Sequence, residues 1–112
     1  MNLVNAEIFP FARQVSVAGE SDIYNNARYS EGVLEVKGTA TAFSVEIQAC
    51  IDITDTIEWT TLMVVNESDF STLDNIVDKG LYAFSMTGKN KIKVKINSVS
   101  GGYLTITGKF IG

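Results

Sequence analysis

The fold is decided by residues 91–111, which read KIKVKINSVSGGYLTITGKFI. From Lys91 to Ile96, isoleucine and valine alternate with lysine, so that apolar and charged side chains fall on opposite sides of an extended chain. This period of two is typical of a β-strand with one face in the protein core. The pair Gly101-Gly102 suits a tight turn, because glycine adopts positive φ readily, and alternation resumes after it. We therefore predict a β-hairpin over residues 91–111.

Similar patterns extend over most of the chain. Residues 43–50, FSVEIQAC, alternate as clearly as the first segment. Clusters of glycine, asparagine, aspartate and serine favour turns between further predicted strands, which cover residues 14–18, 32–39, 62–65, 70–77 and 81–87. The stretch 70–77 also fits helical spacing. Strands this short, about eight of them, predict one all-β domain that is a sandwich or a barrel.

The N-terminal segment lacks this alternation. Phe9 and Phe11 flank Pro10 in an apolar cluster. Residues 1–13 are therefore expected to form an arm, and residues 14–112 the folded domain. Such an arm could cap the domain or dock on a neighbouring subunit, which makes Phe9 and Phe11 candidate assembly contacts.

Composition disfavours several classes of protein. The 112 residues are 46% hydrophobic and 20% charged, as in an ordinary globular domain. Histidine is absent and Cys50 is the only cysteine, which disfavours zinc sites, histidine-based catalysis and an internal disulfide. The chain has no secretory signal pattern and no apolar run of the roughly 18 residues that span a membrane. We expect a protein made in the cytoplasm that is not an enzyme, with no cofactor and no membrane partner.

Charge divides the chain in two. Residues 1–78 hold all 13 acidic residues and three basic ones, whereas residues 79–112 hold six lysines and no acid. Lys91, Lys93 and Lys95 could bind nucleic acid, but the cluster lacks arginine and the rest of the chain repels phosphate. Two other interpretations stay open: the lysines face acids on a neighbouring strand, or they are assembly contacts with the acidic part of another copy.

The acidic stretch over residues 52–58 offers Asp52, Asp55 and Glu58 as oxygen ligands for calcium. It lacks the glycine-bearing spacing of an EF-hand loop, and a solvated loop explains it as well. A pair of these carboxylates could also serve glycoside hydrolysis, but nothing in the sequence places them across a cleft. We expect neither a metal site nor catalysis here.

Aromatic residues offer a candidate sugar-binding surface. Trp59 and Tyr103, with the remaining tyrosines, could stack on the apolar faces of sugars. The alternative, which we favour, is that these rings pack in the core and at its rim. Tyr103 shares a face with Thr105 and Thr107 and is the aromatic residue that we most expect to be exposed.

Five stretches together resemble a pattern found in small bacteriophage structural proteins. Residues 79–88, 91–102 and 104–110 form a strand ending in a glycine turn, a basic alternating strand with a Ser-Gly-Gly connection, and a closing strand that ends in Gly108-Lys109-Phe110. Residues 34–40 followed by 43–48 look like the opening half of the same unit. The resemblance spans about residues 30 to 111. It implies a single jelly-roll-like antiparallel β-sandwich, used in the virion as a head-decoration, fibre, neck or tail module.

The resemblance also implies a function without catalysis. The expected partners are further copies of the chain, in a homo-oligomer, and other virion proteins. The alternative function is a carbohydrate-binding module that attaches the particle to host glycans, because the same fold supports both roles.

Overall fold

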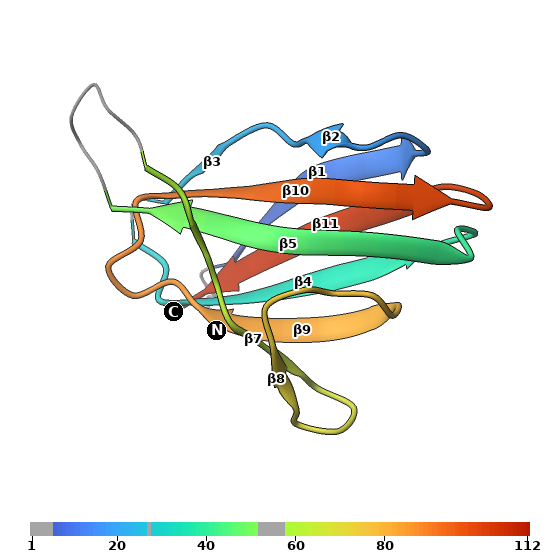
Figure 1. Cartoon of the computed structure of the whole chain (residues 1–112). Helices are drawn as coiled ribbons and strands as arrows, with labels where there is room; N and C mark the ends of the chain where they lie inside the picture. The colour runs from blue at the N-terminus through green and yellow to red at the C-terminus, as the bar shows by residue number, and fades with distance from the viewer. Residues whose placement is uncertain (1–5, 27, 52–57) are drawn as a thin grey trace.

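The computed structural model describes residues 6–26, 28–51 and 58–112 and shows two antiparallel β-sheets packed face to face (Figure 1). The first sheet has the order β1-β11-β4-β9-β7-β8, and the second has the order β2-β10-β5-β6, with β3 also paired to β10. The strands are β1 (Ala6–Val15), β2 (Gly19–Glu20), β3 (Tyr24–Asn25), β4 (Glu31–Gly38), β5 (Ala42–Cys50), β6 (Thr60–Thr61), β7 (Val64–Asn66), β8 (Thr72–Leu73), β9 (Gly80–Ser85), β10 (Lys91–Ser100) and β11 (Leu104–Ile111). The predicted all-β, jelly-roll-like sandwich is confirmed. The described residues form eleven strands, five of which have only two or three residues.

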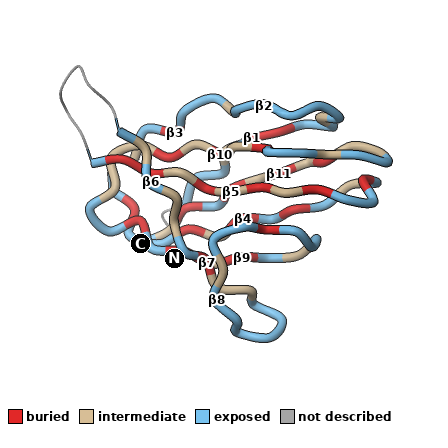
Figure 2. Tube along the Cα trace, viewed as in Figure 1, coloured by how far each residue is buried: buried red, intermediate tan, exposed pale blue. Residues whose placement is uncertain are grey.

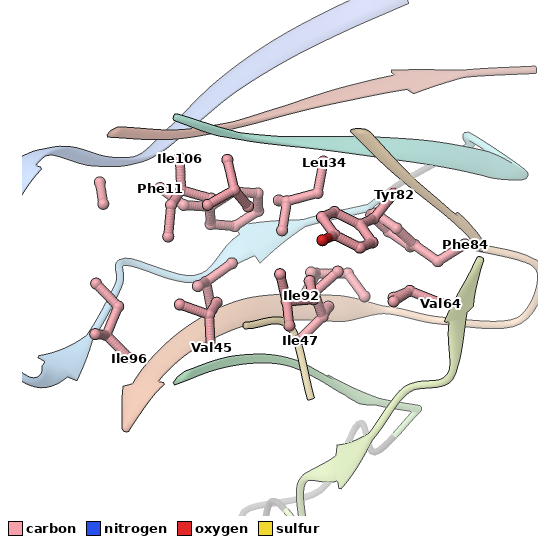
Figure 3. Close-up of a cluster of buried hydrophobic side chains, with 14 of the residues drawn as sticks. Phe11, Leu34, Val45, Ile47, Val64, Tyr82, Phe84, Ile92, Ile96 and Ile106 are labelled. Atoms are coloured by element: carbon pink, nitrogen blue, oxygen red, sulfur yellow. The ribbon is translucent and has the colours of Figure 1, made fainter. Parts of the chain in front are cut away.

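The core lies between the sheets, because buried residues alternate with more exposed ones along β4, β5, β9, β10 and β11 (Figure 2). In β10, Ile92 and Val94 are buried, and the lysines beside them are partly exposed. Leu34 and Ile106 of the first sheet face Ile47 of the second across this core (Figure 3). Each such side chain contributes about 1.5–3 kcal/mol when buried. Among the described residues no charged side chain is buried.

The predicted hairpin over residues 91–111 is wrong, although both of its strands exist. Strand β10 pairs with β5 in the second sheet, whereas β11 pairs with β1 and β4 in the first. The turn between them therefore carries the chain across the core from one sheet to the other. Alternation indicates which side chains point inward, but two strands that face each other across a core satisfy it as well as two hydrogen-bonded neighbours.

Three crossings of this kind lie side by side at one end of the sandwich, joining β1 to β2, β10 to β11 and β4 to β5 (Figure 1). The backbone amides of Thr39 and Ala40 both donate to the carbonyl oxygen of Tyr103, at 3.0 Å. Gly102 has a φ of 148°, and a Cβ there would lie 2.7 Å from the backbone oxygen of Thr39. The glycine pair is thus required by the close packing of two crossings rather than by a hairpin.

The expected N-terminal arm is, from residue 6 onward, strand β1 at the edge of the first sheet, paired antiparallel with β11. A register shift between Pro10 and Ala12 turns Phe11 and Ala12 into the core together. This irregularity explains why the sequence shows no alternation here. Pro10 suits an edge strand, since it has no N–H to donate to a further neighbour.

An aromatic cluster fixes β1 to the core. The ring of Phe11 packs edge-on against those of Phe9 and Phe110, with centroids 4.8 and 6.2 Å apart, and Tyr24 stacks on Phe110 at 4.0 Å. A Cβ at Gly108 would lie 2.6 Å from the Phe11 ring, so this position has no room for a side chain. Phe11 is therefore a core residue, with Phe9 partly buried against it, and we correct its predicted role as an assembly contact.

The other predicted strands differ in outcome. Those over residues 32–39, 43–50 and 81–87 correspond to β4, β5 and β9, and 62–65 overlaps β7. The strand predicted over residues 14–18 is wrong, because β1 ends at Val15. Residues 70–77 contain only β8 and an isolated bridge between Ile76 and Val45. In the part of the chain that is described, no helix is long and apolar enough to cross a membrane.

Candidate functional site

The outer face of the second sheet gathers polar side chains from β10 and β5. In the register of the sheet, Lys93 lies opposite Gln48, and Lys95 lies opposite Glu46. The Gln48 amide donates to one carboxylate oxygen of Glu46 at 2.9 Å, and the Thr61 hydroxyl of β6 donates to the other at 3.4 Å. Side-chain hydrogen bonds to the Glu46 carboxylate therefore link β5 and β6 on this face.

Lys93 is the centre of this face. Its ammonium lies 4.4 Å from the ring centroid of Trp59 and forms an ion pair with Glu20 of β2. The side chain is only 13% exposed, whereas that of Glu20 is 52% exposed. The hydrogen bond and the charge of Lys93 lower the pKa of Glu20 below its usual value, and Lys95 adds a smaller effect. Lys93 thus binds β2 and the segment before β6 to the sheet.

For Lys93 and Lys95, these contacts bear out one of the two interpretations left open: both lysines face acids on neighbouring strands. Lys95 lies opposite Glu20 in β2 as well as opposite Glu46 in β5. Lys91, at the start of β10, lies opposite Cys50 and Asn25 and is partly exposed. A role of Lys91, Lys93 and Lys95 in assembly stays a prediction, and Lys93 is the least available of the three.

The structure does not bring Trp59 and Tyr103 together. Trp59 precedes β6, which pairs with Gln48 and Ala49 of β5. These two residues lie opposite the start of β10, whereas Tyr103 lies in the crossing after the end of β10. Ser100 lies seven positions after Lys93 along β10, a distance of about 23 Å. One sugar-stacking platform made by both rings is therefore excluded. Three of the tyrosines are buried, which agrees with packing in the core: Tyr24, Tyr29 and Tyr82.

The candidate calcium ligands lie at the boundary of the described region. Asp52 and Asp55 fall outside the described residues, and Glu58 is exposed. Within the described residues, no three side chains of the types that bind metals are grouped as a site. Cys50 is buried at the end of β5.

The outer face of the first sheet has an apolar character that sequence analysis missed. One row across the sheet runs through Ile8, Lys109, Val33, Ala83 and Val65, each from a different strand. Ile8 is 65% exposed, and the other apolar members are partly exposed. No single strand shows this row, because each contributes one residue to it.

Two shallow hollows lie on this outer face. One, of about 590 Å³, is lined by apolar side chains of the row together with Glu31 and Glu67. The other, of about 610 Å³, lies over β1 and β11 at the register shift of β1. Its lining residues are Ile8, Pro10, Arg13, Gln14, Thr105 and Thr107. Shallow, open surfaces of this kind suit a protein partner better than a small molecule, which usually occupies a deep pocket.

Comparison with solved structures shows two proteins of the same fold. The crystal structure of SPBc2 prophage-derived protein YomS matches with a TM-score of 0.89 and 18% identity, over 100% of this chain and 97% of that one. The crystal structure of PBSX exported protein XepA matches with a TM-score of 0.90 and 21% identity, over 100% of this chain. The chain spans 39% of the length of that protein. No curated protein sequence matches.

The family comparison extends further than the resemblance noted in the sequence. The family model named XepA matches residues 5–110, which includes the N-terminal residues that the resemblance left out. The relation to phage-derived proteins is therefore confirmed at the level of the family. The chain belongs to the XepA family.

Proposed function

We propose that the chain is a non-enzymatic structural module of a bacteriophage or prophage-encoded particle, which assembles with copies of itself and with other particle proteins. The observation that carries this proposal is membership of the XepA family over nearly the whole chain. A prophage-derived protein of almost the same length shares the fold, which supports the phage context.

The electrostatics of the described residues support a structural role. Two carboxylates have a lowered pKa, and each holds part of the fold in place. Glu20 owes this to Lys93, which joins β2 to β10. Asp69 owes it to hydrogen bonds from the backbone amide and hydroxyl of Ser71, which hold the turn between β7 and β8. Both carboxylates therefore stabilise the positions of strands and turns, as we expect in a module whose function depends on its shape.

The surfaces support assembly. An apolar row on the outer face of a sheet is costly to expose and is typical of a contact with another protein. The outer face of the second sheet, by contrast, is occupied by its own ion pair and hydrogen bonds. We therefore assign the main contact surface to the first sheet.

Carbohydrate binding is the alternative function. Trp59 is partly exposed, as a ring that stacks on sugars must be, but Lys93 already lies over it. Retention on immobilised glycans would favour this role.

The test is fractionation of a lysate from an induced host that carries the gene, with intact particles separated on a density gradient. We expect the chain in the particle fraction, and we expect it to stay there after washing in 0.5 M salt. A chain found free in the medium and retained on a glycan column, with Trp59→Ala abolishing the retention, would overturn the proposal in favour of the alternative. Tyr103→Ala is the matched control, because the structure places that residue far from Trp59.

A further inference from the structure

The hairpin of β7 and β8 presents an unusual side chain to solvent. Phe70, in the turn between the two strands, is 80% exposed and has a φ of 61°. Left-handed backbone is unfavourable for a bulky residue and is normally taken by glycine or asparagine. Strain of this kind persists only where the surrounding structure holds it.

The turn is held by its own hydrogen bonds. The amide of Phe70 donates to the carbonyl of Asn66 at 2.7 Å, and the amide of Asn66 donates to the carbonyl of Ser71 at 2.8 Å. The Asp69 carboxylate accepts from the amide and hydroxyl of Ser71, at 3.0 and 2.7 Å. The Phe70 ring is thus carried by a turn that hydrogen bonds hold in place, and this turn projects from the body of the sandwich (Figure 1). An exposed ring held in this way has the character of a binding anchor, because little conformational entropy is lost when it is buried.

The opposite edge of the first sheet carries a matching surface. The hairpin is at one end of the strand order and β1 is at the other. The hollow over β1 and β11 is lined by the apolar side chains of Ile8 and Pro10, by two threonines and by Arg13. Gln14, beside Arg13, is the other non-glycine residue with positive φ among the described residues, with a φ of 50°.

The charges of the two edges are complementary. The turn carries Glu67 and Asp69 beside the exposed ring, with Asp74 just after β8. The β1 edge carries Arg13 and, one strand in, Lys109 opposite Ile8. Over the ranges 6–26, 28–51 and 58–112, the ion pairs are Lys37–Glu35 and Lys93–Glu20, so neither Arg13 nor Lys109 forms an ion pair with another described residue.

We infer that Phe70 of one copy inserts into the hollow formed by Ile8, Pro10 and Arg13 of a second copy, so that the chain assembles head to tail along the strand order of the first sheet. This inference rests on the self-assembly in the proposed function and names its interface. The contact is made by side chains rather than by adding a strand to the sheet, because Pro10 and the register shift interrupt the free edge of β1. A contact between two different patches builds closed rings or open filaments.

Phe70→Gly separates association from stability. Glycine removes the ring and tolerates the left-handed φ, so the thermal midpoint is expected to stay or rise. Association, measured by sedimentation velocity over a range of concentrations, is expected to weaken at least about tenfold, the effect of losing one buried aromatic anchor. Ile51→Ser is the matched control: it removes a 69% exposed apolar side chain at the other end of the sandwich from the three crossings and should assemble like the wild type.

Mixing two variants tests the head-to-tail geometry. Arg13→Glu places a negative charge in the hollow and should also prevent assembly, since it repels the acidic turn. A mixture of Phe70→Gly with Arg13→Glu retains one intact turn and one intact hollow, so it should form a one-to-one heterodimer and nothing larger. Oligomers that persist in Phe70→Gly, or a mixture that stays monomeric, would overturn the interface while leaving self-assembly intact. A wild-type chain that stays monomeric at millimolar concentration would instead contradict the self-assembly itself.

Discussion

Replacing Lys93 by alanine distinguishes a structural lysine from an assembly contact. The variant loses a cation 4.4 Å from the Trp59 ring centroid and an alkyl stem that is largely buried. A partly desolvated cation–π contact contributes about 0.5–2 kcal/mol. The ion pair with half-exposed Glu20 adds little, because solvent screens it. We therefore expect the free energy of unfolding to fall by about 1–2 kcal/mol.

The expected shift can be measured by thermal unfolding. With an unfolding entropy of about 2.1 cal/mol/K per residue, a loss of 1–2 kcal/mol in a chain of 112 residues lowers the midpoint by roughly 4–9 °C. Lys95→Ala is the matched control, since Lys95 lies on the same face of the same strand without a ring beneath it. We expect that variant to lose less than about 2 °C. Equal midpoints for the two variants would refute the reasoning.

The pH dependence of the Lys93 variant supplies a second check. The pKa of Glu20 is lowered in the folded protein, so the stability that its ion pair provides is present above the unfolded pKa of about 4.3 and is lost as the pH falls through the folded value. The difference between wild type and Lys93→Ala should therefore be smaller at pH 3 than at pH 7. A difference that grows on acidification would show that Glu20 does not contribute to it.

Two further variants test the core. Val94→Asp puts an unpaired carboxylate at a position that is 1% exposed, and the free energy of unfolding should fall by more than about 3 kcal/mol. Circular dichroism at 37 °C should then show a largely unfolded chain. Asn97→Asp, on the exposed surface, is the control and should melt like the wild type. Gly108→Ala forces a Cβ to within 2.6 Å of the Phe11 ring and should cost about 1–3 kcal/mol in urea unfolding; a change below 0.5 kcal/mol would contradict the packing of β1 on β11.

Sequence reasoning predicted the faces of the strands but not their neighbours. The alternation around Val94 and Ile47 correctly placed those side chains in the core, because burial of one face imposes a period of two. Which strands are hydrogen-bonded neighbours leaves no such local pattern, so Gly101-Gly102 predicts a hairpin where the structure has a crossing between the sheets. The conformation of this glycine pair is set instead by close packing against a second crossing, more than 60 residues earlier in the sequence.

In the candidate site too, the residue types could be recognised from the sequence but their contacts could not. Trp59 and Lys93 were each singled out, but their contact joins residues 34 positions apart and depends on how β6 and β10 are ordered around β5. Phe11 was misassigned because a register shift removes the alternation that marks a strand. Phe70 went unnoticed because its exposure follows from a turn conformation that its residue type does not favour.

The copy number of the chain in purified particles tests the central claim most directly. Quantitative mass spectrometry with labelled reference peptides would count it against the major capsid protein of the same particles. We predict a fixed number greater than one, equal in independent preparations and unchanged by washing in 0.5 M salt, as repeated self-assembly on a symmetric particle requires. A trace amount that varies between preparations and is lost on washing would contradict the claim that the chain is a structural module of the particle.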